Sequence, residues 1–285
     1  MGGAHCQGMA RACHFARNIP CERRSVFWGR WWRKLDQSAR TCDQALWKLT
    51  SREQDMTGQK SLIIINPNAS QTVTDGIDNA VQPLRSFGIP IRCLTLADGP
   101  LGIESQKQAD LTIAPMLTLA AEQTDAAGYV IACFGDPGLH ALRDQTPLPV
   151  VGIQEAAVTS ALTLGQRFGV IAIMQNSIPR HLRALGAMGV LDRLAGDRAL
   201  GLSVADLADS DKSLNAMIAT GHRLRDEDGA NVLIMGCAGM AHYRSVLEDA
   251  TGLPVVEPCQ AAVRLALGQI VLNLSHKSGN KIHAR

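Results

Sequence analysis

From residue 61 onward, short runs of apolar residues alternate with longer stretches in which apolar residues recur at helical spacing. Continuous apolar runs of this length are typical of buried strands in parallel sheets, and the longer stretches are typical of amphipathic helices. The runs that predict strands are residues 62–66, 90–94, 130–133, 150–153, 170–174, 232–236 and 255–257. The stretches that predict helices are residues 72–87, 115–127, 155–164, 179–188, 213–226, 240–250 and 260–272. The alternation predicts an α/β fold built from βα units with mainly parallel sheets.

An internal repeat sets the expected architecture. The segment LPVVGIQEAAV at 148–158 matches LPVVEPCQAAV at 253–263, 105 positions later. Upstream, a predicted strand ends at Cys133 in one copy and at Cys237 in the other, 104 positions apart. At the front of the copies, IIINPNAS ends at Ser70 and VIAIMQNS ends at Ser177. A period of this length suits two α/β lobes better than a solenoid.

We therefore expect two pseudo-symmetric Rossmann-like lobes, each with a parallel sheet flanked by helices. The first lobe would comprise residues 61–165, completed by a C-terminal helix at 259–273, and the second lobe residues 166–258. In such sheets, ligands bind outside the carboxyl ends of the strands. Because Cys133 and Cys237 follow such strand ends, we expect the two thiols to face one another in a cleft between the lobes.

Two opposed thiols suit the inversion of a carbon that bears an acidic hydrogen. One face of the carbon needs a base and the other an acid, and the reverse reaction exchanges these roles. Two cysteines, each with an ordinary pKa of about 8.5, are matched for this task if one is held as the thiolate. The backbone N–H groups of Phe134, Gly135, Ala238 and Gly239 are candidates to stabilise an enolate oxygen. The alternative is that the cysteines are small core residues, and this interpretation stands for Cys93 and Cys259, which have no repeat partner.

Polar side chains after the first strand of each copy are candidates for substrate binding. Asn66, Asn68 and Ser70 form one such turn, and Asn176 belongs to the equivalent turn of the second copy. An ordinary turn or helix N-cap is the alternative for all of them.

Two acidic residues, Asp136 and Glu155, are candidates to orient the site. An Asp before Pro137 is also a normal start for a helix.

Charge and cysteine usage exclude several classes of protein. Residues 1–55 hold 10 Lys and Arg against 5 Asp and Glu, whereas the remaining residues hold 18 against 21 and offer no broad basic surface for nucleic acid. No apolar run is long enough to cross a bilayer, so we expect no membrane partner.

The cysteines lack CxxC spacing and no His cluster accompanies them, so we expect no metal site. Eight cysteines could suggest a disulfide framework, but their scatter through a large chain without a signal peptide favours a reducing cytoplasm.

The two ends of the chain differ from the repeat. Residues 1–55 hold all four tryptophans in an irregular basic sequence, and we expect little ordered structure there. A start of the protein at Met56 is the plainer explanation of this segment, and a transit peptide is the alternative. We expect a solvated tail at residues 276–285.

Over residues 61–272 the chain resembles the aspartate/glutamate/hydantoin racemase superfamily, specifically its hydantoin and allantoin racemase branch. The motifs that carry the resemblance are IINPNAS at 64–70, ACFGDPGL at 132–139, PVVGIQEAA at 149–157, MGCAGMA at 235–241 and GLPVVEP at 252–258. The resemblance implies two pseudo-symmetric α/β lobes, no cofactor, a small-molecule substrate and a homo-oligomer. It also implies racemisation at a carbon next to a carbonyl by Cys133 and Cys237.

One departure from the superfamily helps to choose the substrate. Amino-acid racemases of the superfamily typically place Thr-His after the second cysteine, and this chain has Ala238-Gly239. A neutral hydantoin- or allantoin-like cyclic amide is therefore favoured. Residues 171–180 lack the threonine-rich segment usual in hydantoin racemases, a difference that concerns the pocket for the C5 substituent.

Two other functions stay open at this point. The same scaffold could carry out amino-acid racemisation, maleate-type isomerisation or decarboxylation, although decarboxylases of the superfamily need only one of the two cysteines. A non-catalytic protein that binds small amides is the second alternative.

Overall fold

The computed structural model describes residues 59–202 and 210–276, which belong to one compact unit beginning at Gln59. The predicted extension at residues 1–55 and the tail beyond His276 lie outside the described residues. Within the described part of the chain, no helix is long and apolar enough to cross a membrane.

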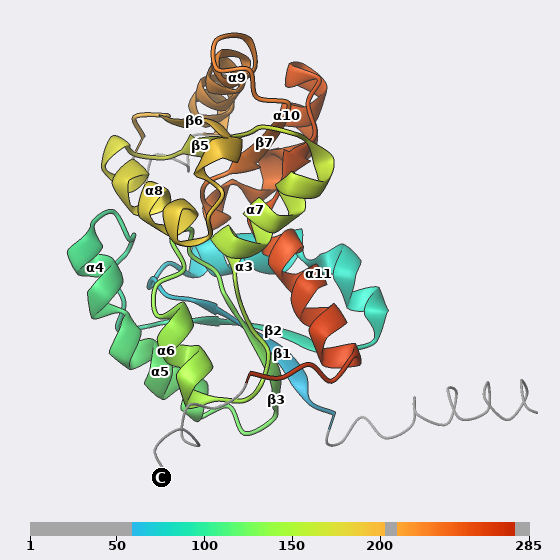
Figure 1. The fold of residues 1–285 in the computed structure, drawn as a ribbon. Helices are drawn as coiled ribbons and strands as arrows, with labels where there is room; N and C mark the ends of the chain where they lie inside the picture. The colour runs from blue at the N-terminus through green and yellow to red at the C-terminus, as the bar shows by residue number, and fades with distance from the viewer. Residues whose placement is uncertain (1–58, 203–209, 277–285) are drawn as a thin grey trace, which may run out of the picture. The chain divides into compact units, whose positions relative to one another are not determined.

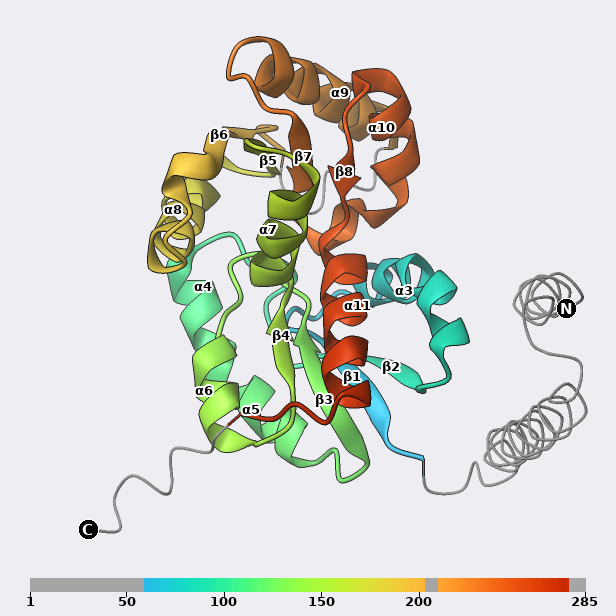
Figure 2. The same cartoon turned by 45° about the vertical axis from the view of Figure 1, so that its right-hand side comes forward.

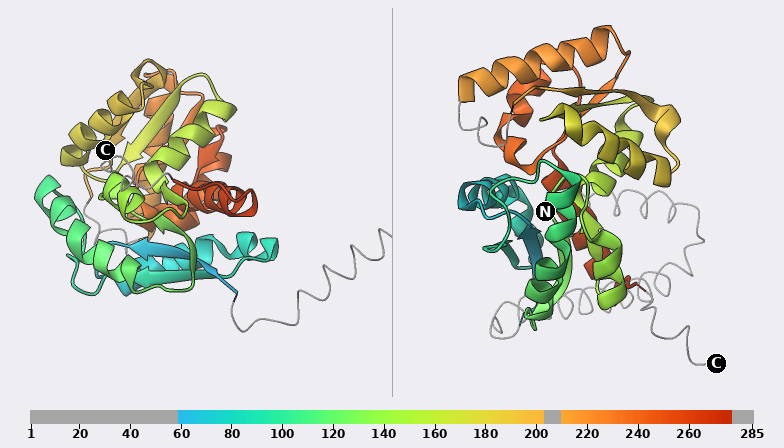
Figure 3. Two further views of the ribbon diagram at one scale, coloured as in Figure 1. Left: turned by 60° about the horizontal axis from the view of Figure 1, so that its bottom comes forward. Right: turned by 90° about the vertical axis from the view of Figure 1, so that its left-hand side faces the viewer.

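Two four-stranded parallel sheets form the framework (Figures 1 and 3). The first sheet has the order β2-β1-β3-β4, and its strands are β1 (Ser61–Asn66), β2 (Ile91–Thr95), β3 (Ala126–Ile131) and β4 (Val150–Gly152). The second sheet has the matching order β6-β5-β7-β8, and its strands are β5 (Phe168–Ala172), β6 (Leu194–Ala199), β7 (Val232–Met235) and β8 (Val255–Val256). The predicted α/β class with two similar lobes is confirmed.

Helices cover both sheets. The α-helices are α3 (Gln71–Ala80), α4 (Gln106–Leu111), α5 (Ile113–Ala121), α6 (Leu139–Gln145), α7 (Ile153–Leu164), α8 (Ile178–Ala187), α9 (Ser210–Asp226), α10 (Arg244–Thr251) and α11 (Pro258–Val271). Short 3₁₀ helices are η3 (Gln82–Phe87), η4 (Gln175–Ser177), η5 (Leu191–Arg193) and η7 (Ala238–Tyr243). Helices α4 and α6 and strand β6 were not predicted from the sequence.

Two predicted helices have different bounds in the structure. The helix predicted over 72–87 ends as α3 at Ala80 and continues as η3, which has Pro83 in its first turn. Proline lacks the N–H that an α-helix needs in its interior, so the α-helix does not run through this point. The helix predicted over 115–127 ends at Ala121 as α5, and the residues from Ala126 onward belong to β3.

Burial explains why most strands could be predicted and why β6 could not. All six residues of β1 and all four of β7 are buried, which produces continuous apolar runs in the sequence. Strand β6 has the sequence LAGDRA, lies at a sheet edge and is only partly buried along its length. An edge strand with this composition gives neither an apolar run nor an alternating pattern.

The last helix of the chain packs on the first sheet. Helix α11 contacts α7 and also contacts β3 and β4, although it follows the final strand of the second sheet (Figure 2). This packing supports our assignment of the C-terminal helix to the first lobe, which stays a proposal. One continuous apolar cluster includes Ile64 and Val130 of the first sheet together with Phe168 and Ile234 of the second. The lobes therefore share part of their core.

Candidate active site

The two repeat-related cysteines line one small cavity. Cys133 follows β3 and Cys237 follows β7, each two residues beyond the last residue of its strand. Both thiols border a cavity of about 50 Å³ together with residues of the turns after β1 and β5. Helix α3 of the first lobe packs against η7, the segment directly after Cys237. Residues that follow the carboxyl ends of strands in both sheets thus line one cavity.

Hydrogen bonds distinguish the two thiols. The Cys237 sulfur accepts a hydrogen bond from the Gly239 N–H at 3.3 Å, whereas the Cys133 thiol donates to the Phe134 carbonyl at 3.8 Å. Burial raises the pKa of Cys133 to about 12, and a charge on Cys237 contributes to this rise. Burial also raises the pKa of Cys237 to about 11, although the Gly239 N–H acts in the opposite direction. Cys237 is therefore the better supported anion when no substrate is bound.

Asp136 holds the beginning of the helix that follows β4. Its carboxylate accepts hydrogen bonds from the N–H groups of Gln154 and Glu155, each at 2.9 Å. Asp136 adopts a left-handed backbone conformation with φ of 47°, which aims its side chain back at α7. Burial raises the pKa of Asp136 to about 7. Its role in the structure is to cap α7 and to fix the loop that carries Cys133.

The second lobe has the same cap, built from a different position. Glu257 accepts hydrogen bonds from the N–H groups of Cys259 and Gln260 at the start of α11. In the repeat, these donors correspond to Gln154 and Glu155, so the two helices are capped at equivalent groups. Burial raises the pKa of Glu257 to about 7 as well. Glu257 was not predicted as a site residue, although its position in the repeat, equivalent to Gly152, is a usable signal.

The predicted turn residues after β1 divide into two groups. Asn68 lines the cavity that contains both thiols. Asn66 is 1% exposed, and its amide donates hydrogen bonds to Asn68, to the Ser70 carbonyl and to Thr74. Ser70 caps α3 by accepting a hydrogen bond from the Val73 N–H at 3.4 Å. Asn66 and Ser70 therefore shape the turn, while Asn68 faces the cavity.

In the equivalent turn after β5, Ser177 lines the cavity and Asn176 does not. Asn176 lies in η4 and is exposed.

The segments next to the cysteines border the same space. Phe134 and Ala238 line the cavity with the thiols, and Gly135 lines a larger adjoining cavity. Within the described residues, no protein group accepts a hydrogen bond from the N–H of Phe134 or Gly135. The Gly239 N–H is already bonded to Cys237. The first lobe thus offers N–H groups for a substrate oxygen.

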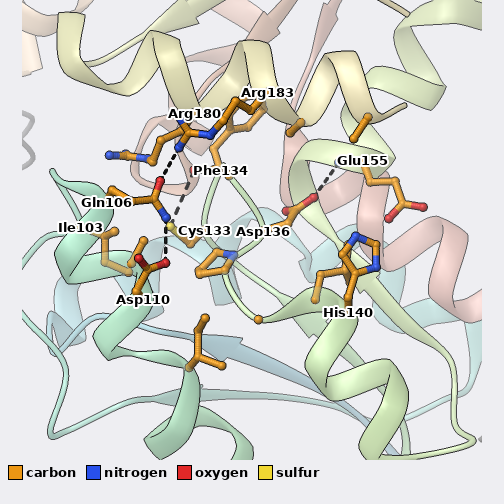
Figure 4. A pocket seen from close by; sticks show the side chains of 18 of the residues that line it. Ile103, Gln106, Asp110, Cys133, Phe134, Asp136, His140, Glu155, Arg180 and Arg183 are labelled. Atoms are coloured by element: carbon orange, nitrogen blue, oxygen red, sulfur yellow. Dashed lines mark hydrogen bonds between the residues drawn. The ribbon is translucent and has the colours of Figure 1, made fainter. Parts of the chain in front are cut away.

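The larger cavity, of about 460 Å³, extends from Cys133 along α4, α6 and α8 (Figure 4). Glu155 lies in its wall and is paired with Arg143 at 2.9 Å. Arg183 donates a hydrogen bond to Gln106, which in turn donates to Asp110 at 2.7 Å. Most charged groups of this cavity are therefore already paired.

Two titratable residues of the cavity wall, and the partner of one of them, were not predicted from the sequence. Arg180 lines both cavities, and His181 lines the smaller one. The His181 ring contacts Asp197 of β6 through Nδ1 at 2.8 Å and packs edge-on against Phe134, with 4.9 Å between the ring centroids. The side chains of His181 and Asp197 are each 2% exposed. None of these residues has a matching residue type in the other half of the repeat, so the repeat gave no signal for them.

The arrangement is suited to acid–base chemistry on the two faces of one small molecule. A thiol approaches from each lobe, and unused N–H groups lie beside Cys133. Among the residues that the structure describes, no group of three or more His, Cys, Asp or Glu side chains could hold a metal ion.

The sequence of this chain matches a known protein family and its members. Residues 62–266 match the family model described as Asp/Glu/Hydantoin racemase. A hydantoin racemase of Paenarthrobacter aurescens is 32% identical over 224 residues, which cover 77% of this chain and 94% of that protein.

Solved structures agree with this match. The allantoin racemase of Pseudomonas fluorescens superposes with a TM-score of 0.73 at 27% identity, covering 78% of this chain and 94% of that one. The allantoin racemase of Klebsiella pneumoniae superposes with a TM-score of 0.71 at 29% identity, covering 76% and 90%.

Proposed function

Because the chain belongs to the Asp/Glu/hydantoin racemase family, we propose that it racemises hydantoin- or allantoin-like cyclic amides by proton transfer between Cys133 and Cys237. The chain is a racemase by this membership. The substrate class and the two-thiol mechanism are the proposal.

The observation that carries the mechanism is that both thiols line one cavity from opposite lobes. The two groups are electrostatically coupled, since a charge on Cys237 raises the pKa of Cys133. This coupling disfavours two thiolates at once, so a molecule in which one thiol has ionised keeps the proton of the other. One base and one acid is the state that inversion needs.

The proposed reaction moves one proton in and one proton out. The thiolate of one cysteine removes the hydrogen of the carbon next to the carbonyl and becomes a thiol, and the bonding pair passes into an enolate. The thiol of the other cysteine then gives its proton to the opposite face of the carbon and becomes a thiolate. In this proposal the N–H groups of Phe134 and Gly135, which have no acceptor among the described residues, stabilise the enolate oxygen.

The residues after Cys237 support a cyclic amide as the substrate. Ala238 is 3% exposed and lines the cavity without offering a charged or hydrogen-bonding side chain. A ring amide can use backbone groups and the Asn68 side chain for its polar contacts. The hydantoin and allantoin racemases among the relatives agree with this choice.

Isotope exchange on enantiopure substrates tests the proposal. The full chain is added to enantiopure allantoin and to enantiopure 5-substituted hydantoins in D₂O, with circular dichroism for racemisation and NMR for exchange at C5. We expect the dichroism to decay with deuterium uptake, above a protein-free blank. Dichroism that follows the blank with every ring would contradict the proposed substrate class. Thermal stabilisation by a ring that is not turned over would instead indicate a binding protein.

Cysteine variants test the mechanism separately. Cys133→Ser and Cys237→Ser should each slow racemisation by about a hundredfold or more, because inversion needs both groups. Each variant should still exchange the C5 hydrogen of one enantiomer, since the remaining thiol can remove and return a proton on its own face. Cys93→Ser, outside the cavity, is the matched control. Full racemase activity in either cavity variant would exclude the two-thiol mechanism.

Assembly into a homo-oligomer and a location in the cytoplasm stay predictions from the sequence. Size-exclusion chromatography with light scattering tests the first of them.

A further inference from the structure

The wall of the small cavity breaks the symmetry of the repeat at one position. Ser70 and Ser177 end the equivalent turns, and three residues further along lie Val73 and Arg180. Both of these residues line the cavity that contains the two thiols. The first lobe therefore presents an apolar side chain where the second lobe presents a cation.

Arg180 differs from Arg183 and Arg143, the other arginines of the cavity wall, in its hydrogen-bond acceptors. Within the described residues, no carboxylate or carbonyl accepts a hydrogen bond from its guanidinium, although the residue is only partly exposed. In contrast, Arg183 is bonded to Gln106 and Arg143 to Glu155. Burial and the nearby Arg183 lower the pKa of Arg180, and Cys133 is the group whose negative charge would favour the cation.

The location of Arg180 connects the thiols to a larger space. It lines both the small cavity and the cavity of about 460 Å³, together with Cys133, Phe134 and Ile103. Figure 4 shows Arg180 and Arg183 in the wall of this cavity on the side of α8. A substrate whose reacting carbon lies between the thiols would extend its substituent past this guanidinium.

A partly buried charge is unfavourable unless an opposite charge or good acceptors compensate it. The Asp136 carboxylate is engaged by two backbone N–H groups, and Glu155 is held by Arg143. Asp110 accepts a hydrogen bond from Gln106. The acidic side chains of this cavity are thus engaged elsewhere, and the position of Arg180 suits an acceptor that arrives with the substrate. Carboxylates are the partners that a guanidinium binds in bidentate fashion.

We infer that Arg180 is a specificity-determining residue that binds a carboxylate of the substrate. The preferred substrate would then be a cyclic amide whose C5 substituent ends in a carboxylate. This inference rests on the proposed function and narrows its substrate class. A free acidic amino acid would present the same carboxylate chemistry, and the experiment below separates the two sources.

The test compares isosteric substituents. The rate constant kcat/KM is measured for enantiopure hydantoin-5-acetic acid, its carboxamide analogue and 5-benzylhydantoin, and for L-aspartate. We expect the carboxylate ring to exceed its carboxamide by about 10- to 100-fold, as for a charge-assisted hydrogen bond. Arg180→Gln should remove this advantage, so that the ratio of kcat/KM for the carboxylate to that for the carboxamide falls to about one, and Arg180→Lys should retain part of it. Arg92→Gln, exposed on β2 and outside both cavities, is the control.

The outcomes separate the inference from the proposed function. Equal rates with carboxylate and carboxamide, or an equal loss for both in Arg180→Gln, would overturn the inference while leaving the racemase of cyclic amides intact. The equal loss would show that Arg180 acts on the Cys133 thiolate instead. If L-aspartate is the one compound turned over and Arg180→Gln abolishes this turnover, a cyclic amide is not the substrate, and both proposals lose that part. Binding of a substrate carboxylate by Arg180 would then be the part that stands. If nothing is turned over, the thermal shift caused by the carboxylate ring against its carboxamide still decides the role of Arg180.

Discussion

The carboxyl group of Asp136 occupies the space in which a side chain of residue 152 would begin. A Cβ atom added to Gly152 would overlap the Asp136 carboxyl group. In the second half of the repeat, the residue equivalent to Gly152 is Glu257, which supplies a carboxyl group to the same helical N–H groups from its own backbone position. The two lobes therefore build one cap in two ways.

The cap of the second lobe should be transferable to the first lobe only if Gly152→Glu and Asp136→Gly are made together. Gly152→Glu alone places a second carboxyl group against Asp136, and Asp136→Gly alone removes the cap of α7. We expect each single change to lower the free energy of unfolding by about 1–3 kcal/mol, through overpacking in one case and loss of a cap in the other. The double variant should recover about 1 kcal/mol or more relative to the sum of the singles.

Urea denaturation of the four proteins measures this coupling. Gly76→Ala is the control, because a Cβ there meets no atom within 4 Å and alanine favours a helix interior. Additive losses in the double variant would show that a glutamate side chain introduced at this position cannot replace the Asp136 cap.

The two capping carboxyls should make the protein less stable as the pH rises from about 4 to about 7. Burial raises the pKa values of Asp136 and Glu257 to about 7, so the folded protein keeps protons that the unfolded chain releases. Their contribution to stability is present at low pH and is lost as the pH rises through the folded values. The loss is up to about 1.4 kcal/mol per pH unit for each carboxyl over this window.

Unfolding by urea at several pH values from about 4.5 to about 7.5 tests this dependence, because this range runs from just above the ordinary carboxyl pKa values to just above the raised ones. The combined variant Asp136→Asn and Glu257→Gln should show a flatter dependence than wild type. The exposed Asp192→Asn should keep the wild-type slope. An unchanged slope in the combined variant would place the pH dependence in other groups.

The rate of racemisation should increase with pH well above neutrality. Burial raises the pKa values of Cys133 and Cys237 to about 12 and about 11, so both thiols are protonated in most molecules at neutral pH. The thiolate fraction, and with it kcat/KM, should grow about tenfold per pH unit below these values. Polarimetric rates between about pH 7 and 9.5, corrected for spontaneous racemisation, measure this slope. A plateau beginning below about pH 8 would show that one thiol of the free enzyme ionises near neutrality despite its burial.

The buried contact between His181 and Asp197 should contribute to stability. Asp197→Ala leaves the His181 Nδ1 without its partner in a position where the side chain is 2% exposed. An unsatisfied buried polar group costs about 1–3 kcal/mol, so we expect a loss of this size in the free energy of unfolding. Asp192→Ala, at an exposed position, should change stability by less than about 0.5 kcal/mol. Equal stability of the two variants would mean that water replaces the missing carboxylate.

The parts of the site that both halves share could be predicted from the sequence. Cys133 and Cys237 stand out because each follows an apolar strand at matching positions, and the parallel topology then brings strand ends together. The matching strand orders follow from the same repeat.

The parts that differ between the halves could not be predicted in this way. Thr74 bonds Thr95 in the first lobe, whereas the corresponding helix of the second lobe uses His181 to bond Asp197 of an edge strand. The strand that carries Asp197 has no apolar run, so neither the strand nor the pair had a signal in the sequence. The role of Asp136 as a cap for α7 depends on a left-handed backbone and on the space left by Gly152, which only the folded chain reveals.

The unequal surroundings of the two thiols have a consequence for the kinetics of the proposed reaction. Two enantiomers that differ at a single centre are equally stable in water, so at equilibrium neither can predominate. The Haldane relation then requires equal kcat/KM values in the two directions, although Gly239 bonds only Cys237 and Arg180 lies beside Cys133. The asymmetry can only change kcat and KM together, by stabilising one bound enantiomer more than the other. A difference in how the lobes hold their thiols is thus visible in saturation and in inhibition by the product enantiomer, and is hidden in the initial rate at low substrate concentration.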